Sequence, residues 1–282
     1  MQEIVQEICS AEKLGAVKNV RPIAGGSINL CFQVTTNLGR YFVKMNNQVP
    51  DDYFAVEFKS LELLDKYART PRVQAHGKAQ DASYLVLEWI EAISTHPTAI
   101  DDLAFSLAQL HRQTRSEFGL DYNTYVGSLF QSNNNHKLWV DFYVQERIMP
   151  LVKLAFDNSL LTEANVKQIE SLCGKLGELI PAAKPSLLHG DLWNGNYLLS
   201  GNRAYFIDPA VYYGHREMDL AMTHLFGAFP ERFYEVYESS LPLEKNWESR
   251  LPLFQLYPLL VHLNLFGSSY YPQLEDVLVK FR

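Results

Sequence analysis

The sequence predicts an α+β fold in two lobes, with a β-rich N-terminal lobe at residues 1–90 and a mostly helical C-terminal lobe at residues 91–282. Short β-branched and aromatic runs separated by turns fill the first part, whereas apolar residues at helical spacing fill the second. A change from strands to helices along a chain is typical of α+β architecture. At 282 residues, 47% of them hydrophobic, the chain can build a substantial core around a shared cleft.

Composition excludes several classes of protein. The net charge is -7 and no cluster of Lys or Arg is present, so we expect no nucleic-acid partner. No apolar run reaches the roughly 18 residues that a membrane span needs, and the acidic start of the chain does not resemble a signal peptide. We therefore expect a cytoplasmic protein with no membrane partner. The three scattered cysteines predict neither a disulfide framework nor a metal site.

In the first lobe, LCFQVTTN and YFVKMN flank a turn and predict a β-hairpin. A helix is expected at about residues 54–67, followed by a strand pair in VQAHGKA and SYLVLEWI. In the second lobe, we expect helices at residues 101–113 and 136–148, the latter ending or kinking near Pro150. A third helix is expected at residues 161–180. Its apolar stripe consists of Val166, Ile169, Leu172, Cys173, Leu176 and Leu179.

The most informative stretch is SLLHGDLWNGNYLLSGNRAYFIDPA, residues 186–210. Asp191 and Asn196 lie five positions apart on its first loop. A turn at Gly201 and Asn202 joins two short strands, so the resulting hairpin should return Asp208 to the side of Asn196. The oxygen-bearing side chains of Asp191, Asn196 and Asp208 are therefore expected to converge at the opening of one site.

Phosphoryl transfer requires such a set, because Mg²⁺ prefers oxygen ligands and bridges phosphate oxygens. In protein kinases, H-R-D-x-x-x-x-N supplies a catalytic Asp and a metal-binding Asn, and a later Asp also binds metal. HGDLWNGN has the same spacing, with Gly190 in place of the Arg. Alone, the pattern also fits a polar turn whose Asp and Asn cap backbone groups.

The first lobe favours the kinase interpretation. Lys44 lies inside a predicted strand, where it could also be a surface lysine with a buried stem. Glu57 shares a helical face with Leu61 and Leu64, so its carboxylate should point inward. An inward carboxylate requires a partner, and Lys44 is the natural one. The two should form the Lys–Glu pair that places the lysine on nucleotide phosphates.

Two other stretches fit a nucleotide site, although neither is specific. A glycine turn precedes Lys44 at the distance expected of a lid over phosphates, and it could equally be a simple tight turn. It consists of Gly25, Gly26 and Ser27. Between the lobes, backbone groups could bind adenine as the kinase linker does. These linker candidates are Glu88, Trp89 and Ile90. No Walker or dinucleotide-binding glycine motif is present.

Over nearly its whole length, the sequence resembles the fructosamine kinase, or ketosamine-3-kinase, family. The resemblance rests on GGSIN, YFVKMN, EFKSL, FGLDYNTYVGS, HGDLWNGN, FIDPAVYYGHREMDLAM and LYPLLVHLNLFGSSY. It implies a two-lobed protein-kinase-like fold, ATP and Mg²⁺ as cofactors, and transfer of the γ-phosphate to the C3 hydroxyl of a ketoamine. The implied partners are ketoamine small molecules or glycated proteins, and the implied role is removal of the sugar adduct.

The resemblance also implies residue roles: Asp191 as the base, Asn196 and Asp208 as metal ligands, and Lys44 with Glu57 as the phosphate-positioning pair. Two departures matter. Some relatives have Cys where this chain has Ser27, so redox control at the glycine turn is not implied. Asp208 precedes Pro209-Ala210 rather than Phe-Gly, and a phosphorylation-switched activation loop is not expected.

Four residues are candidates for contact with the substrate. Trp193, beside the base, could stack on the sugar or pack under the loop. Arg216 and Glu217 could touch the substrate or lie outside its pocket. His262 lies on an apolar helical segment, where a core position and a pocket position are both open. His189 is expected to bond backbone near Asp208, and a later carboxylate should brace the catalytic loop. That carboxylate is Asp219.

Three functions remain open at this point. The first is a ketoamine kinase, and the second is a kinase of another amino-alcohol or of an aminoglycoside. The third is a pseudokinase that binds nucleotide without catalysis. A pseudokinase would be expected to lack part of the catalytic set, and all members of that set are present, which favours an enzyme. They are Lys44, Glu57, Asp191, Asn196 and Asp208.

Overall fold

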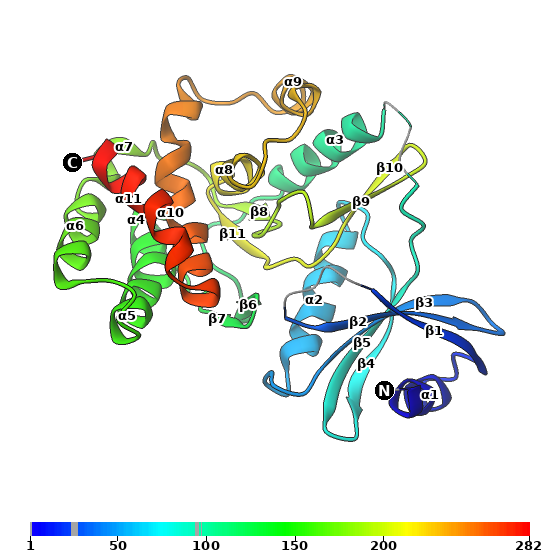
Figure 1. Ribbon diagram of the computed structural model, residues 1–282. Helices are drawn as coiled ribbons and strands as arrows, with labels where there is room; N and C mark the ends of the chain where they lie inside the picture. Colours follow the sequence, from blue (N-terminus) through cyan, green and yellow to red (C-terminus); the bar gives the residue numbers. More distant parts are fainter. Residues whose placement is uncertain (1, 24–27, 94–95, 97) are drawn as a thin grey trace.

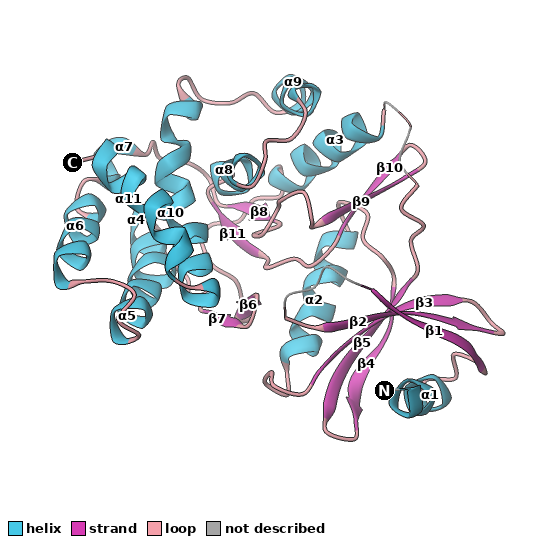
Figure 2. Cartoon of the chain, in the orientation of Figure 1, coloured by secondary structure: helices cyan, strands magenta, loops and turns pink. Residues whose placement is uncertain are grey.

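The computed structural model describes the chain except residues 1, 24–27, 94–95 and 97. The β-rich and helical parts form two lobes that lie side by side (Figure 1). Figure 2 shows the contrast directly, with strands gathered in the N-terminal lobe and helices in the C-terminal lobe. The expected α+β, two-lobed arrangement is confirmed.

The N-terminal lobe is a five-stranded antiparallel sheet with one helix on each face. Its strands run in the order β1-β2-β3-β5-β4. Their bounds are β1 Val17–Ile23, β2 Leu30–Thr36, β3 Arg40–Asn46, β4 Val73–Ala79 and β5 Ala82–Glu88. The helices are α1, Gln2–Ala11, and α2, Tyr53–Asp65. The predicted hairpin, helix and strand pair are therefore confirmed, with α2 beginning one residue earlier than expected.

Side chains of the central strands point alternately to the two faces of the sheet, which explains how a helix packs on each face. Val43 and Val86 pack on the face that α1 covers, in a cluster with Val5 of that helix. Leu85 and Leu87 point to the opposite face and pack against α2 in a second cluster. Because successive side chains of a strand point to opposite faces, one strand supports both layers. Lys44 therefore shares the α2 face with Leu85, its register partner on β5.

The C-terminal lobe is built mainly from helices. These are α3 Ala99–His111, α4 Trp139–Phe142, a π-helix Tyr143–Ile148, α5 Met149–Asp157, α6 Glu163–Cys173, α7 Leu176–Leu179, α8 Glu217–Leu225, α9 Glu231–Ser240, α10 Trp247–Phe266, a 3-10 turn Ser268–Tyr270 and α11 Tyr271–Lys280. Short antiparallel pairs complete the lobe: β6 Thr124–Val126 with β7 Leu129–Gln131, β8 Ser186–Leu188 with β11 Tyr212–Gly214, and β9 Tyr197–Ser200 with β10 Arg203–Phe206. Among the described residues, no helix is long and apolar enough to cross a bilayer.

Two helices differ from the sequence-based expectation. The helical path does not end at Pro150, because a π-helical segment changes the register and Pro150 falls in the first turn of α5. Proline is tolerated there, and the guanidinium of Arg147 donates to the carbonyl of Glu146, four residues before it. The single helix expected at residues 161–180 is wrong. It divides into α6 and α7 at Gly174, although Ile169 and Leu176 are both fully buried.

Candidate active site

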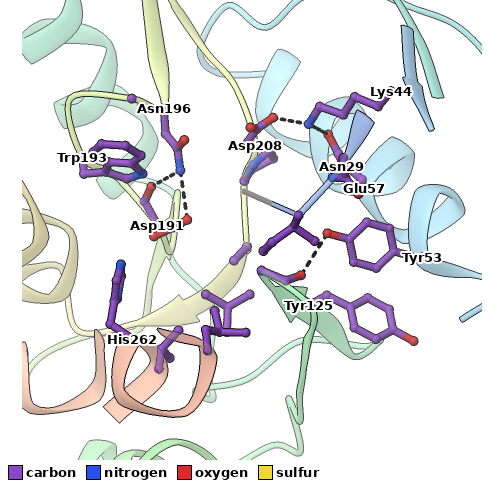
Figure 3. Close-up of a pocket in the computed structure, with 18 of the residues that line it drawn as sticks. Asn29, Lys44, Tyr53, Glu57, Tyr125, Asp191, Trp193, Asn196, Asp208 and His262 are labelled. Carbon is purple, nitrogen blue, oxygen red and sulfur yellow. Dashed lines mark hydrogen bonds and ion pairs between the residues drawn. The ribbon is translucent and has the colours of Figure 1, made fainter. Parts of the chain in front are cut away.

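A cavity of about 270 Å³ opens between the lobes and collects most of the predicted site residues. Its walls come from β2, β3, α2, the β6–β7 hairpin, the loop after β8, the segment after β10 and the end of α10 (Figure 3). The predicted residues that line it are Lys44, Glu57, Asp191, Trp193, Asn196, Asp208 and His262. Among the described residues, no group of His, Cys, Asp and Glu resembles a separate metal site.

Lys44 of β3 lines the cavity from the N-terminal lobe. It is 3% exposed, and its Nζ lies 2.7 Å from Oε1 of Glu57. The predicted Lys44–Glu57 ion pair is therefore confirmed. The ammonium also pairs with the carboxylate of Asp208, which joins the two lobes. Burial opposes the charge on Lys44, but the carboxylates of Asp208 and Glu57 outweigh it and raise its pKa.

The catalytic loop follows β8 and holds Asp191 against Asn196. The amide nitrogen of Asn196 donates to the carboxylate of Asp191 at 2.9 Å and to its backbone carbonyl at 2.7 Å. The predicted turn then joins β9 to β10, and the backbone of Ile207 donates to the carbonyl of Asn196. This pairing returns Asp208 to the cavity, where it adopts a left-handed backbone with φ of 55°. Such backbone strain is concentrated at functional sites in proteins.

The carboxyl group of Asp191 has a raised pKa. Burial, followed by the nearby negative charge of Asp208, raises the pKa of Asp191 to about 7, against the hydrogen bond from Asn196. A general base is most effective when its pKa lies near the working pH. A cation beside Asp208 would favour the ionised form of Asp191, because it would offset the repulsion between the two carboxylates.

Asp219, the second acidic residue of α8, braces the catalytic loop from below. Its carboxylate accepts hydrogen bonds from the backbone of His189 at 2.8 Å and of Gly190 at 2.9 Å. His111 of α3 contacts the same carboxylate at 3.1 Å. His189 in turn places its Nε2 2.9 Å from the carbonyl of Ile207, next to Asp208. The structural roles expected for His189 and Asp219 are thus confirmed.

The glycine that replaces the kinase arginine has a steric explanation. Gly190 has φ of 85°, and a Cβ at this position would lie 2.0 Å from the carbonyl oxygen of Ala210. Only glycine therefore allows the catalytic loop to lie against the segment that follows Asp208. The sequence shows the substitution, but the close approach between the two segments becomes visible only in the fold.

Some of the predicted nucleotide contacts lie elsewhere. Glu88 ends β5, and the next backbone amide, of Trp89, donates to the carbonyl of Arg40. The three predicted linker residues do not line the cavity, so their contact with adenine stays a prediction. They are Glu88, Trp89 and Ile90. The predicted glycine turn falls outside the described residues. It comprises Gly25, Gly26 and Ser27.

The structure places Arg216 and Glu217 away from the cavity. Glu217 is 1% exposed and forms a two-point ion pair with Arg250 of α10, with N–O distances of 2.5 and 3.0 Å. Arg216 donates to the backbone carbonyls of Leu241 and Pro242 beyond α9. Both side chains thus tie the start of α8 to other parts of the C-terminal lobe, Glu217 to α10 and Arg216 to the segment after α9, and neither lines the cavity.

The side of the cavity near α10 is more aromatic than the sequence indicated. Trp193 is 38% exposed at the mouth, with its ring edge toward Phe226. Phe226 packs on His262 at 4.4 Å between ring centroids, and His262 packs on Phe266 at 5.4 Å. Burial lowers the pKa of His262, so its ring is neutral at pH 7. Phe226 lies outside the segments that carried the resemblance, and Phe266 lies within one of them, LYPLLVHLNLFGSSY, although no residue role was predicted for it.

Comparison with known proteins agrees with this geometry. A family model described as fructosamine kinase matches residues 1–281. The chain belongs to the fructosamine kinase family. A ketoamine kinase of Lactiplantibacillus plantarum is 39% identical over 268 residues, which cover 94% of this chain and 95% of that protein. The chloroplastic protein-ribulosamine 3-kinase of Arabidopsis thaliana is 33% identical, over 93% of this chain and 82% of that one.

Solved structures show the same fold. A fructosamine-3-kinase of Thermobifida fusca superposes with a TM-score of 0.88 at 32% identity, covering 98% of this chain and 97% of that one. An aminoglycoside phosphotransferase, APH(4)-Ia, solved with AMP-PNP and hygromycin B, gives a TM-score of 0.67 at 17% identity, covering 98% of each chain. The second likeness concerns the fold alone. Together with its family, the protein-kinase-like fold makes this chain an ATP-dependent kinase that acts on a hydroxyl group.

Proposed function

We propose that this kinase transfers the γ-phosphate of ATP to the C3 hydroxyl of ketoamines, the sugar adducts that form on amines and on protein lysines. The observation that carries the proposal is the meeting of Asp191, Asn196 and Asp208 with Lys44 around one cavity, in a chain of this family. Relatives described as ketoamine and ribulosamine kinases support the choice of acceptor.

The donor set fits Mg²⁺, the ion that accompanies ATP in kinases. Asp208 presents a carboxylate that is 44% exposed toward the cavity, and hard carboxylate and amide oxygens are the ligands that Mg²⁺ prefers. Because the amide nitrogen of Asn196 donates to Asp191, the amide oxygen of Asn196 is the end left to bind metal. Asp208 and Asn196 would hold the ion, which would neutralise charge on the phosphate oxygens.

In the proposed reaction, Asp191 accepts the proton of the acceptor hydroxyl as that oxygen forms its bond to the γ-phosphorus. The bond between the γ-phosphorus and the bridging oxygen breaks, and ADP leaves with that oxygen. Lys44 holds the phosphates, and Glu57 holds Lys44 in place. Catalysis of phosphoryl transfer consists mainly of positioning the reactants and stabilising charge. The contacts of Lys44, Glu57 and Asp191 would provide both.

The chemistry of the product gives the proposal a distinctive consequence. A phosphate on C3 lies next to the C2 carbonyl and β to C1, and it is a good leaving group. When the carbonyl enolises by losing a proton from C1, the C3–O bond breaks, phosphate leaves and an imine forms at C1. Water then hydrolyses this imine, which returns the free amine and releases the sugar carbons as a dicarbonyl compound. A phosphorylated aminoglycoside has no such carbonyl, so its phosphate should persist. The fate of the product therefore separates the two classes of acceptor better than the rate of phosphorylation does.

The test is to incubate a glycated peptide with the enzyme, ATP and Mg²⁺ and to follow the peptide mass over time. We expect a phosphorylated adduct first and slow recovery of the unmodified peptide afterwards. The Asp191→Asn variant, assayed in parallel, should leave the adduct unchanged. A panel of glycated amines and peptides that takes no phosphate, beside efficient transfer to an aminoglycoside, would overturn the choice of acceptor and leave the kinase assignment intact.

A further inference from the structure

The β6–β7 hairpin is a small element of the C-terminal lobe that reaches the N-terminal lobe. Its two strands hold only residues 124–126 and 129–131, and its tip at Gly127 contacts Tyr53 at the start of α2. The backbone at Gly127 has φ of 57°, and a Cβ there would lie 2.7 Å from Leu265 and 2.9 Å from Ile28. The tip is thus wedged between α10 and the segment before β2.

Two tyrosine hydroxyls join this tip to the helix that carries Glu57. Tyr53, the first residue of α2, donates to the carbonyl of Gly127 at 2.9 Å. Tyr125 donates in the opposite direction, to the carboxylate of Asp52 at 2.8 Å. The two rings lie 5.1 Å apart. Because Tyr53 is 8% exposed, its hydrogen bond is largely shielded from water. A polar group that is shielded in this way and has no hydrogen bond costs free energy of folding.

The base of the hairpin is anchored beside the proposed metal ligand. Gln131, 2% exposed, donates to the carbonyl of Ala210 at 3.1 Å and accepts from the hydroxyl of Tyr257 at 2.5 Å. Ala210 follows Asp208 by two residues. The same hairpin therefore contacts both segments that supply a carboxylate to Lys44. Its tip contacts α2, which holds Glu57, and its base contacts the segment that holds Asp208.

We propose that Tyr53 is a positioning residue, which fixes α2 to the β6–β7 hairpin and so holds Glu57 in register with Lys44 and Asp208. Tyr53 and Glu57 lie at i and i+4 on one face of α2, a single turn apart. In protein kinases the corresponding Lys–Glu pair is made and broken by regulatory movement of its helix. Here the hydroxyl latch keeps the helix in the active position without a covalent signal.

The proposal is tested with Tyr53→Phe, which keeps the ring in the core and removes only the donor. The matched control is Tyr67→Phe, at a half-exposed tyrosine just beyond the end of α2. We expect Tyr53→Phe to lower kcat about fivefold, the scale of one buried hydrogen bond, and to raise KM for ATP. The KM for the acceptor should stay close to that of the control, and the thermal midpoint should fall by no more than a few degrees, because the carbonyl of Gly127 loses a shielded donor.

A double-mutant cycle with Glu57→Gln identifies the route of the effect. If Tyr53 acts through Glu57, Tyr53→Phe should lower kcat less than twofold once Glu57 has been neutralised. Full additivity of the two changes would overturn the proposal, as would unchanged kinetics in Tyr53→Phe. A rise confined to the acceptor KM would also overturn it and make Tyr53 a substrate contact, since its ring lines the cavity.

The inference depends on the kinase activity and not on the identity of the acceptor. The same variants can be compared by slow ATP hydrolysis in the absence of acceptor and by calorimetric binding of a non-hydrolysable ATP analogue. Loss of nucleotide affinity in Tyr53→Phe, with none in Tyr67→Phe, would support the latch even if ketoamines are not the substrate. Equal affinities and equal hydrolysis rates in the two variants would contradict the latch whatever the acceptor is.

Discussion

The molecule contains two clusters of acidic residues that differ in burial and in how their charge is balanced. At the start of α8, Glu217 faces the guanidinium of Arg250, and Asp219 accepts two backbone N–H groups and contacts His111. In the cleft, Lys44 pairs with the carboxylates of Glu57 and Asp208, and Asp191 lines the same cavity. Among the described lining residues, Lys44 is the one Lys or Arg beside these three carboxylates. Three negative charges against one positive charge leave the ionised cleft with a formal charge of -2.

This difference indicates that the acids at the start of α8 stabilise the fold, whereas we expect the acids of the cleft to bind a ligand. Each acid at the start of α8 has partners supplied by the chain, so it needs nothing further to be stable. The cleft has an excess of negative charge, and a pKa raised to about 7 at Asp191 is one consequence of burial and that excess. A bound cation would complete the balance, as expected of a site built for metal and nucleotide.

The largest effect is expected from the base in the cleft. Asp191→Asn keeps the shape of the side chain and its contact with Asn196 but removes the proton acceptor. Turnover should fall by about 10²–10⁴-fold, the usual contribution of a positioned acid or base, with little change in ATP affinity. Steady-state kinetics and calorimetric nucleotide binding measure the two quantities. Wild-type turnover in this variant would assign the base elsewhere.

The structural cluster should respond in stability and not in chemistry. Arg250→Met leaves Glu217 buried without its partner and should cost about 3–5 kcal/mol of unfolding free energy. The double change Arg250→Met with Glu217→Gln removes the stranded charge and should recover much of that loss. Denaturant unfolding gives the free energies, and turnover per folded molecule should stay near the wild-type value. A selective change in acceptor KM would restore a substrate role to Glu217.

The metal ligands should show an intermediate effect. Asn196→Ala and Asp208→Asn each remove an oxygen from the proposed ion, so each should raise the Mg²⁺ concentration for half-maximal activity by at least about tenfold. Asp208→Asn also leaves Lys44 with one carboxylate in place of two. A titration of activity against free Mg²⁺ at saturating ATP measures the shift. An unchanged midpoint in both variants would remove these residues from the metal site.

The comparison also shows which parts of the site the sequence could predict. The spacing of Asp191 and Asn196 and the hairpin that returns Asp208 are local, so they could be read directly. The Lys44–Glu57 pair followed from strand position and helical phase, which fix where each side chain points. Local geometry thus carried most of the proposed catalytic set.

The remainder depends on contacts between distant segments. Tyr53 and Gly127 are 74 residues apart, and nothing in either local pattern indicates that they meet. The same limit explains the two open interpretations of Glu217, whose partner Arg250 lies 33 residues further along the chain on another helix. The helix expected at 161–180 divides at Gly174. The apolar residues keep their helical spacing across this position, although α6 ends just before it and α7 begins after it.

The smallest effect concerns pH, and it contrasts function with stability at one residue. The pKa of Asp191 rises from 3.8 to about 7 on folding, so the folded state binds this proton more tightly than the unfolded state does. This group therefore destabilises the ligand-free fold increasingly as pH rises from about 4 to 7. Asp191→Asn should raise the melting temperature by a few degrees at pH 8, and the gain should vanish near pH 4. Calorimetry of both proteins across this range measures the difference, and a gain at pH 4 as large as that at pH 8 would contradict the shifted pKa. In the wild-type enzyme, acceptor kcat/KM should increase with pH as the base ionises, with a midpoint below 7 when the metal and nucleotide are bound, because their cation favours the carboxylate.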